Sequence, residues 1–305
     1  DSVECCDYAS NNIAGNVMSK KVAQCGLKFC EKNFYKPVIL NSKSQDKILN
    51  LDDLSSISRI ELCQKDINLP YSNYDKYIVI NPEEIAEFRG NEIVLLNVYE
   101  ESFSELAQMI TQLLPMSQRI NIIFKFEFQE KLSSIYREQL AQITNQLVSY
   151  LKRKEFREIN ILTDRLFLNE MNNCNCGVDN YALAPNGKIY ICPAFYFNSP
   201  ENYIGDIETG IVEHKLANML RLSNAPLCKR CDAYQCNRCV LLNQKYTREF
   251  NIPGAAQCVK SHIERNASME LLQILRNENI KYGADIKIDA INYSDPIECV
   301  IEELQ

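Results

Sequence analysis

Three segments decide the fold: IVLLNV at 93–98, FSELAQMITQLL at 103–114 and INIIFKF at 120–126. The first and third are short runs rich in β-branched and aromatic residues, which is typical of buried strands. The second has apolar residues at helical spacing and stops before Pro115. A strand, a helix and a second strand in this order predict parallel pairing through a right-handed crossover.

The same alternation continues on both sides of these segments. Four further strands are predicted at Val38–Leu40, Ile60–Cys63, Tyr77–Ile80 and Ile159–Leu162. A long helix is predicted from Ile135 to Leu151, where apolar residues recur at helical spacing. We therefore expect the fold class to be α/β, with residues 1–168 forming an N-terminal scaffold domain that is either a partial α/β barrel or an open α/β sheet.

The pattern changes after Leu166, where regular periodicity gives way to turn residues. Pro185-Asn-Gly-Lys188 separates two short apolar segments and predicts a hairpin, because an Asn-Gly pair tolerates the positive φ that a tight turn requires. A last helix is predicted from Ser261 to Arg276, followed by an extended tail around Ile286–Ile291. Residues 169–305 are therefore predicted to form a second, cysteine-rich domain of a hairpin, loops and a helix.

The composition and the sequence motifs argue against several kinds of binding partner. The chain of 305 residues carries 33 basic and 40 acidic side chains, which are intermixed and give a net charge of -7. Without a long basic tract, no nucleic acid is expected as a partner. No apolar run approaches the roughly 18 residues that a membrane span needs, so no membrane partner is expected. The absence of a GxxxxGKS or GxGxxG loop argues against ATP or NAD.

The fourteen cysteines are unevenly distributed. Eight fall between Cys174 and Cys258, and the others are Cys5, Cys6, Cys25, Cys30, Cys63 and Cys299. Disulfide frameworks occur mostly in small secreted domains that lack a core, whereas this chain has a long core-forming half. We therefore expect metal ligation by thiolates in a reducing, cytoplasmic compartment. Five of the scattered cysteines are interpreted as small buried apolar side chains, with a further metal site as the alternative: Cys5, Cys6, Cys25, Cys30 and Cys63.

The spacing Cys228-x2-Cys231-x4-Cys236-x2-Cys239 predicts a metal site, because two such pairs of thiolates supply four ligands. Tetrahedral sulfur ligation suits either zinc or iron–sulfur. Four more thiols flank this segment: Cys174, Cys176, Cys192 and Cys258. A set of eight favours two iron–sulfur clusters, and zinc remains the alternative.

The cysteine order, the Pro-Asn-Gly hairpin and the segment Ile204-Gly-Asp-Ile207 resemble the SPASM domain, the auxiliary-cluster module appended to radical SAM enzymes that modify peptides. Three segments are more closely similar to the CXXX repeat peptide maturases: ICPAFYF at 191–197, CDAYQCNRC at 231–239 and HIERNAS at 262–268. That family is associated with gene systems that also encode a radical SAM enzyme and a peptide with repeated cysteines. The resemblance covers the chain from about Cys174 to Ser268.

By similarity to SPASM domains, the eight cysteines would hold two 4Fe-4S clusters. The first would be bound by Cys174, Cys176, Cys192 and Cys239, and the second by Cys228, Cys231, Cys236 and Cys258. The spacing of x2, x4 and x2 is shorter than the usual SPASM spacing of x2, x5 and x3. If only one of Cys174 and Cys176 ligates, one iron keeps an open position for a substrate thiolate. If both ligate, the clusters are closed and suit electron transfer or structural support.

A radical SAM enzyme needs three cysteines spaced x3 and x2, and no two cysteines here are separated by three residues. We therefore expect no SAM binding, and interpret the N-terminal half as a degenerate radical-SAM-like or peptide-docking scaffold. The resemblance implies an accessory subunit that binds or positions a cysteine-rich, ribosomally synthesised precursor peptide, or relays electrons, for a separate radical SAM enzyme. Two alternatives stay open: a zinc-stapled peptide- or protein-binding module without a redox role, and a free-standing iron-dependent peptide-modifying enzyme.

Side chains near the cysteines are assigned supporting roles. Tyr190 and 195–197 flank Cys192 and are interpreted as an apolar shield, because burial affects the reduction potential of a cluster. Three basic residues are candidates for offsetting negative charge or for solvation: Lys229, Arg230 and Arg238. His262 is interpreted as a polar contact near a cluster rather than as a ligand.

Overall fold

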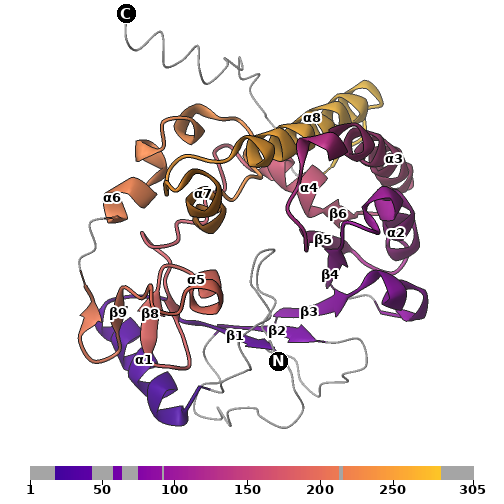
Figure 1. Cartoon of the computed structure of the whole chain (residues 1–305). Helices are drawn as coiled ribbons and strands as arrows, with labels where there is room; N and C mark the ends of the chain where they lie inside the picture. The colour runs from indigo at the N-terminus through magenta and orange to yellow at the C-terminus, as the bar shows by residue number, and fades with distance from the viewer. Residues whose placement is uncertain (1–17, 43–57, 64–74, 91–92, 213–215, 283–305) are drawn as a thin grey trace, which may run out of the picture. The chain divides into compact units, whose positions relative to one another are not determined.

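The computed structural model describes residues 18–42, 58–63, 75–90, 93–212 and 216–282 (Figure 1). The chain divides into two compact units. Unit 1 consists of Asp1–Val79 and Asn175–Arg221, and unit 2 of Ile80–Cys174 and Leu222–Gln305. The border near residue 168 that the sequence pattern suggests stays a prediction. No helix among the described residues is long and apolar enough to cross a membrane.

Unit 2 contains parallel strands connected by helices, as the sequence predicts. The strands are β4 (Ile93–Val98), β5 (Arg119–Phe124) and β6 (Glu158–Ile159). β4 is preceded by η2 (Pro82–Glu87), β5 by η3 (Phe103–Glu105) and α2 (Leu106–Leu113), and β6 by η4 (Glu130–Leu132) and α3 (Ser133–Lys152). The register places Val94 opposite Ile120, and Ile120 opposite Ile159. The α/β class is confirmed.

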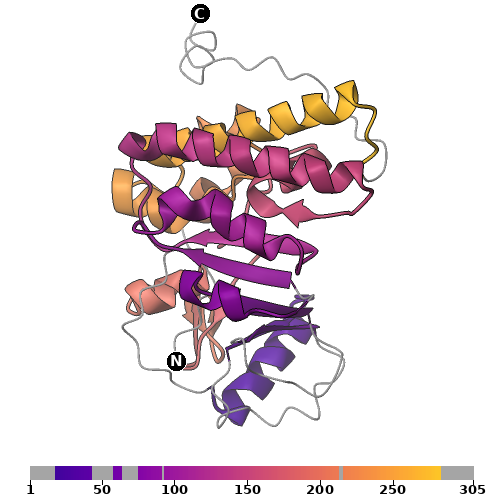
Figure 2. The ribbon, with the colours of Figure 1, turned by 90° about the vertical axis from the view of Figure 1, so that its right-hand side faces the viewer.

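Apolar side chains alternate along the strands of unit 2 and form its core with the helices. On β5, Ile120, Ile122 and Phe124 are buried, while the residues between them are half-buried. Ile110 of α2 and Leu140 of α3 are fully buried. Burying each such side chain contributes about 1.5–3 kcal/mol. Figure 2 shows α3 running alongside the C-terminal helix α8, with which it packs.

β6 is shorter than the strand predicted at Ile159–Leu162, because the chain turns into the short helix α4 (Asn160–Thr163). The Asn160 side chain makes the hydrogen bonds to Ile122 on β5 that the backbone of a longer β6 would make. Its Nδ2 donates to the Ile122 carbonyl (3.2 Å), and its Oδ1 accepts from the Ile122 amide (3.0 Å). The prediction was wrong here because a short apolar run does not distinguish a strand from a buried helix.

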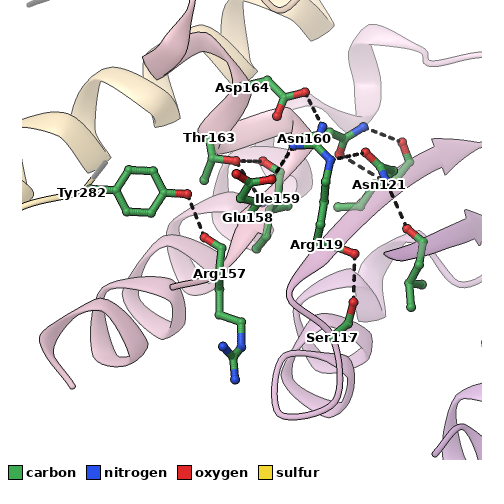
Figure 3. A network of polar contacts seen from close by, with 12 residues as sticks. Ser117, Arg119, Asn121, Arg157, Glu158, Ile159, Asn160, Thr163, Asp164 and Tyr282 are labelled. Atoms are coloured by element: carbon green, nitrogen blue, oxygen red, sulfur yellow. Dashed lines mark hydrogen bonds and ion pairs between the residues drawn. The ribbon is translucent and has the colours of Figure 1, made fainter. Parts of the chain in front are cut away.

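Arg119 on β5 joins the beginnings of β5 and β6 (Figure 3). Its Nη1 lies 2.8 Å from Glu158 Oε2, and its Nη2 lies 2.8 Å from Asp164 Oδ2. Burial lowers the pKa of this guanidinium, but the hydrogen bonds to Asp164 and Glu158 outweigh burial, so the pKa is raised above its usual value. Asp164 is the first residue of η5 (Asp164–Phe167), so one of these ion pairs connects β5 with the start of η5.

Unit 1 contains a helix, three parallel strands and a small antiparallel sheet. Helix α1 (Lys20–Lys32) is capped by Ser19. The parallel strands are β1 (Val38–Ser42), β2 (Ser58–Cys63) and β3 (Asp75–Ile80), each of which includes a predicted strand. The antiparallel sheet has the order β10-β9-β8-β7, with β7 at Ala182–Leu183, β8 at Lys188–Tyr190, β9 at Gly205–Asp206 and β10 at Gly210–Ile211. Two short helices complete the unit, α5 (Pro193–Asn198) and α6 (Ala217–Leu220).

The predicted Asn-Gly hairpin is confirmed between β7 and β8. The Gly187 amide donates to the Ala184 carbonyl (2.9 Å), and the Ala184 amide donates to the Lys188 carbonyl (3.0 Å). Gly187 has φ +78°, whereas Asn186 has a negative φ. The loop therefore holds three residues and ends on a left-handed glycine, a common arrangement for loops of this length.

The cysteine-rich segment and the C-terminal helix belong to unit 2. In chain order the elements are η6 (Leu222–Asn224), η7 (Cys228–Arg230), α7 (Val240–Thr247) and α8 (Ala255–Asn277). Helix α8 begins before its predicted start at Ser261, because its first turn follows Gly254 and carries no large apolar residue to signal it. The helix thereby includes Cys258. The tail predicted at Ile286–Ile291 lies outside the described residues.

Candidate metal centre

Four of the predicted ligands lie within electrostatic reach of one another in unit 2, and none of them forms a disulfide: Cys228, Cys231, Cys236 and Cys258. Cys228 is the first residue of η7, and Cys231 follows as its C-terminal cap. Cys236 lies in the loop before α7, and Cys258 lies near the start of α8. The early start of α8 thus places Cys258 on that helix, and η7 with the loop after it supplies the other three cysteines.

The four thiols are close enough to influence one another's pKa. Burial raises the pKa of Cys228 to about 12, and negative charge at Cys236, Cys258 and Cys231 adds to this effect. Burial and then Cys236 and Cys231 raise the pKa of Cys258 to about 11. Burial also raises the pKa of Cys231. Thiols that are buried near one another lose their protons less readily, because each thiolate adds negative charge beside the others. Ligation to a metal centre supplies the positive charge that balances the thiolates.

Backbone amides already face two of these sulfurs. The Ala233 amide donates to Cys231 Sγ (3.5 Å), and the Arg238 amide donates to Cys236 Sγ (3.4 Å). Arg238 reaches this position with φ +48°, a left-handed conformation that is costly for a residue other than glycine. In both cases the donor lies two residues after the cysteine, so each half of the loop curls around its sulfur. Amides that point at a sulfur stabilise its thiolate form.

These four cysteines carry the donor groups that the predicted second cluster needs. Backbone amides donate to two of the sulfurs, and the charge of the buried Arg238 guanidinium opposes the rise in the pKa of Cys228. Within the described part of the chain, no three His, Cys, Asp or Glu side chains are spaced as the ligands of a single metal ion.

Cys174 is held against the loop that ends at Cys239. Three contacts join the two segments: the Asn172 amide donates to the Tyr234 carbonyl (2.8 Å), the Cys174 amide to the Asn237 carbonyl (3.3 Å), and Arg238 Nε to Asn173 Oδ1 (2.9 Å). The structure thus pairs the segments that carry two of the ligands predicted for the first cluster.

The other two ligands predicted for the first cluster, Cys176 and Cys192, belong to unit 1. Cys176 is buried between two residues of positive φ, Asn175 (+52°) and Gly177 (+73°). A Cβ at Gly177 would contact the Ile191 side chain, so the segments around the two cysteines adjoin. Because this set is divided between the units, the first cluster stays a prediction.

Asp232 forms a buried charged contact that sequence reasoning missed. It directly follows Cys231, and its Oδ2 lies 3.1 Å from Arg165 Nη2 while its Oδ1 lies 2.7 Å from Arg265 Nη1. Arg165 is 1% exposed and also donates through Nε to the Asp232 carbonyl (3.0 Å). Arg165 belongs to η5 and Arg265 to α8. Asp232 therefore connects the segment from Cys228 to Cys239, called the cysteine loop below, with two other elements of unit 2. No sequence signal links an arginine to an aspartate so far along the chain.

His262 lies on α8, one helical turn after Cys258. Its Nε2 is 3.5 Å from Cys231 Sγ. This contact agrees with its interpretation as a polar neighbour of the cysteine site. The other histidine, His214, lies outside the described residues.

The aromatic residues around Cys192 are largely buried. Tyr190 and Phe195 are almost inaccessible, and the rings of Tyr190 and Tyr196 meet edge to face at 5.6 Å between centroids. This is the packing that an apolar shield requires. Of the scattered cysteines, Cys25 and Cys30 lie on α1; Cys5, Cys6, Cys299 and the side chain of Cys63 lie outside the described part of the structure.

These features define a class of fold in which parallel α/β structure is combined with a small antiparallel sheet and cysteine-rich loops. No protein-family model matches the chain, and no curated protein matches it. Among solved structures, the fold is similar to that of native anSMEcpe with bound AdoMet, with a TM-score of 0.60 and 11% identity over 89% of this chain and 95% of that chain.

Two further structures of native anSMEcpe hold a peptide as well as AdoMet. The structure with the Cp18Cys peptide gives a TM-score of 0.58 at 12% identity, over 89% of this chain and 95% of that chain. The structure with the Kp18Cys peptide gives a TM-score of 0.56 at 11% identity, over 89% of this chain and 94% of that chain. At such low identity the likeness establishes the fold alone.

Proposed function

We propose that this chain is an iron–sulfur accessory protein in the maturation of a ribosomally synthesised, cysteine-rich peptide. The observation that carries the proposal is the convergence of Cys228, Cys231, Cys236 and Cys258 in a fold similar to that of anSMEcpe, a protein solved with AdoMet and with peptides. The chain binds or positions the peptide, or relays electrons, for a separate radical SAM enzyme. That enzyme supplies the radical, because this sequence has no three cysteines spaced x3 and x2.

In this proposal the two clusters are 4Fe-4S centres. The second is held by the four converging cysteines, and the first by Cys174, Cys176, Cys192 and Cys239. When bound, a 4Fe-4S centre accepts or donates single electrons, and its potential depends on charge, burial and hydrogen bonds to sulfur. The chain supplies all three: buried and half-buried cysteines, amide donors and the guanidinium of Arg238.

Zinc is the alternative metal for these four cysteines. One zinc ion with Zn–S bonds of about 2.3 Å would hold its sulfurs roughly 3.8 Å apart in a tetrahedron, whereas in a four-iron cluster each thiolate binds a different iron and the sulfurs lie further apart. The total of eight cysteines from Cys174 to Cys258 favours clusters over a single zinc ion.

Metal and sulfide analysis of anaerobically purified protein tests this assignment. We expect about eight irons and eight sulfides per chain in the wild type and about four of each in Cys236→Ser, because the second cluster loses a ligand. Cys25→Ser, on α1, is the matched control and keeps the wild-type content. Stoichiometric zinc without iron contradicts the proposal and favours the zinc-stapled module.

The role in peptide maturation is tested by reconstitution. The loaded protein is combined with a cysteine-rich precursor peptide and a radical SAM enzyme, and peptide modification is followed by mass spectrometry. We expect modification only when all three are present, and less of it with Cys236→Ser than with Cys25→Ser. Modification by this chain and the peptide alone would instead identify a free-standing enzyme.

A further inference from the structure

The polar surroundings of Cys231 distinguish this sulfur among the four that converge. Its Sγ lies 3.5 Å from the Ala233 amide nitrogen and 3.5 Å from His262 Nε2. His262 belongs to α8, and the adjoining turn of the same helix carries Cys258. One helix therefore supplies both a ligand to the predicted cluster and a polar group to a different ligand.

The chemistry of a bound thiolate determines the direction of the contact with His262. A cysteine that ligates iron has lost its proton, so its sulfur can only accept a hydrogen bond. His262 Nε2 must then carry the proton and donate it. A donor aimed at a thiolate stabilises the reduced cluster more than the oxidised one, because the sulfurs carry more negative charge after reduction.

We propose that His262 is a positioning residue whose Nε2–H donates to Cys231 Sγ and makes the second cluster easier to reduce. The inference rests on the proposed function, since it requires a cluster at these four cysteines. It assigns α8 a role in setting the reduction potential, in addition to supplying Cys258. The donor comes from a side chain, so it can be exchanged without disturbing the loop backbone.

The test is a dithionite titration of the anaerobically loaded full chain, followed by electron paramagnetic resonance. Wild type is compared with His262→Gln, which keeps an N–H donor, and with His262→Leu, which has none. We expect His262→Leu to lower the ratio of reduced to oxidised second cluster by up to about tenfold at a fixed potential, which is about 59 mV for a one-electron couple. His262→Gln retains more of the wild-type potential than His262→Leu. Glu270→Gln, at an exposed position of α8, is the control and leaves the potential unchanged.

The outcomes separate this inference from the function on which it rests. If the wild type holds no iron, the proposed function fails. If both variants load iron normally and His262→Leu keeps the wild-type potential, the inference alone is overturned. It is also overturned if wild-type protein shows the strong ¹⁴N hyperfine coupling of a directly bound imidazole and His262→Leu lacks it, because His262 is then a ligand.

Discussion

Asp232 connects the loop from Cys228 to Cys239 with two other elements of unit 2. Its carboxylate lies between the guanidinium groups of Arg165 and Arg265, and all three side chains are largely buried. Burial lowers the pKa of Arg165, and the negative charge of Asp232 offsets only part of this effect. A carboxylate that neutralises two buried cations is difficult to replace, because its loss leaves both without their counter-ion.

We expect Asp232→Asn to lower the free energy of unfolding of unit 2 by about 3 kcal/mol, the usual cost of breaking a buried ion pair. Chemical denaturation of the full chain under reducing conditions measures this loss. Adding Arg265→Gln recovers part of it, because one of the two uncompensated cations is removed.

The exposed pair Lys152–Glu278 provides the matched control. Glu278→Gln costs less than about 1 kcal/mol, because water screens charges at the surface. If Asp232→Asn lowered the free energy of unfolding no more than Glu278→Gln does, the ion pairs of Asp232 with Arg165 and Arg265 would not hold the cysteine loop.

At the scale of elements, the turn between β9 and β10 depends on Asp206. Its Oδ1 accepts from the Thr209 amide (2.8 Å), Thr209 Oγ1 (2.9 Å) and the Glu208 amide (3.0 Å), and Lys188 Nζ lies 3.3 Å from Oδ2. These hydrogen bonds, those from Thr209 first, hold the pKa of Asp206 well below its ordinary value of 3.8.

The sign of the pH dependence follows from this lowered pKa. The stabilisation is present above pH 3.8, the ordinary value, and is lost as the pH falls towards the lower pKa of the folded protein. We therefore expect Asp206→Asn to lower the melting temperature at pH 7, with a difference from wild type that shrinks below pH 4. Circular dichroism melts from pH 7 to pH 2 measure this difference. Glu208→Gln, at the exposed neighbouring position, shows no such convergence; a pH-independent Asp206→Asn effect would disprove the assigned hydrogen bonds.

At the scale of the whole molecule, bound iron should stabilise the fold. In the proposed arrangement the clusters bind the folded chain and not the unfolded one, so their removal lowers stability by mass action. We expect anaerobic chelation of the loaded protein to lower its melting temperature and to speed hydrogen exchange in 228–239. The α2–α3 region, which has its own apolar core, serves as the internal control. Equal exchange in 228–239 before and after chelation would show that no cluster orders this loop.

Local patterns predicted the regular elements well, because periodicity depends on neighbouring residues. The segment at 93–98 is a strand with the predicted bounds, and the hairpin around Gly187 follows from its Asn-Gly turn. The pattern failed at 160–162, where the Asn160 side chain pairs with Ile122 on another strand. It also missed the start of α8, because the first turn of that helix, from Ala255 to Cys258, carries no large apolar side chain.

The sequence by itself determined the α/β class and the set of eight candidate ligands, since alternation and cysteine spacing are local properties. Only the tertiary structure decided which thiols meet in unit 2, and that Asp232 is held by Arg165 and Arg265. It also placed His262 beside Cys231. The physical reason is that these contacts join side chains far apart along the chain, so no local pattern encodes them and folding alone brings the groups within reach of one another.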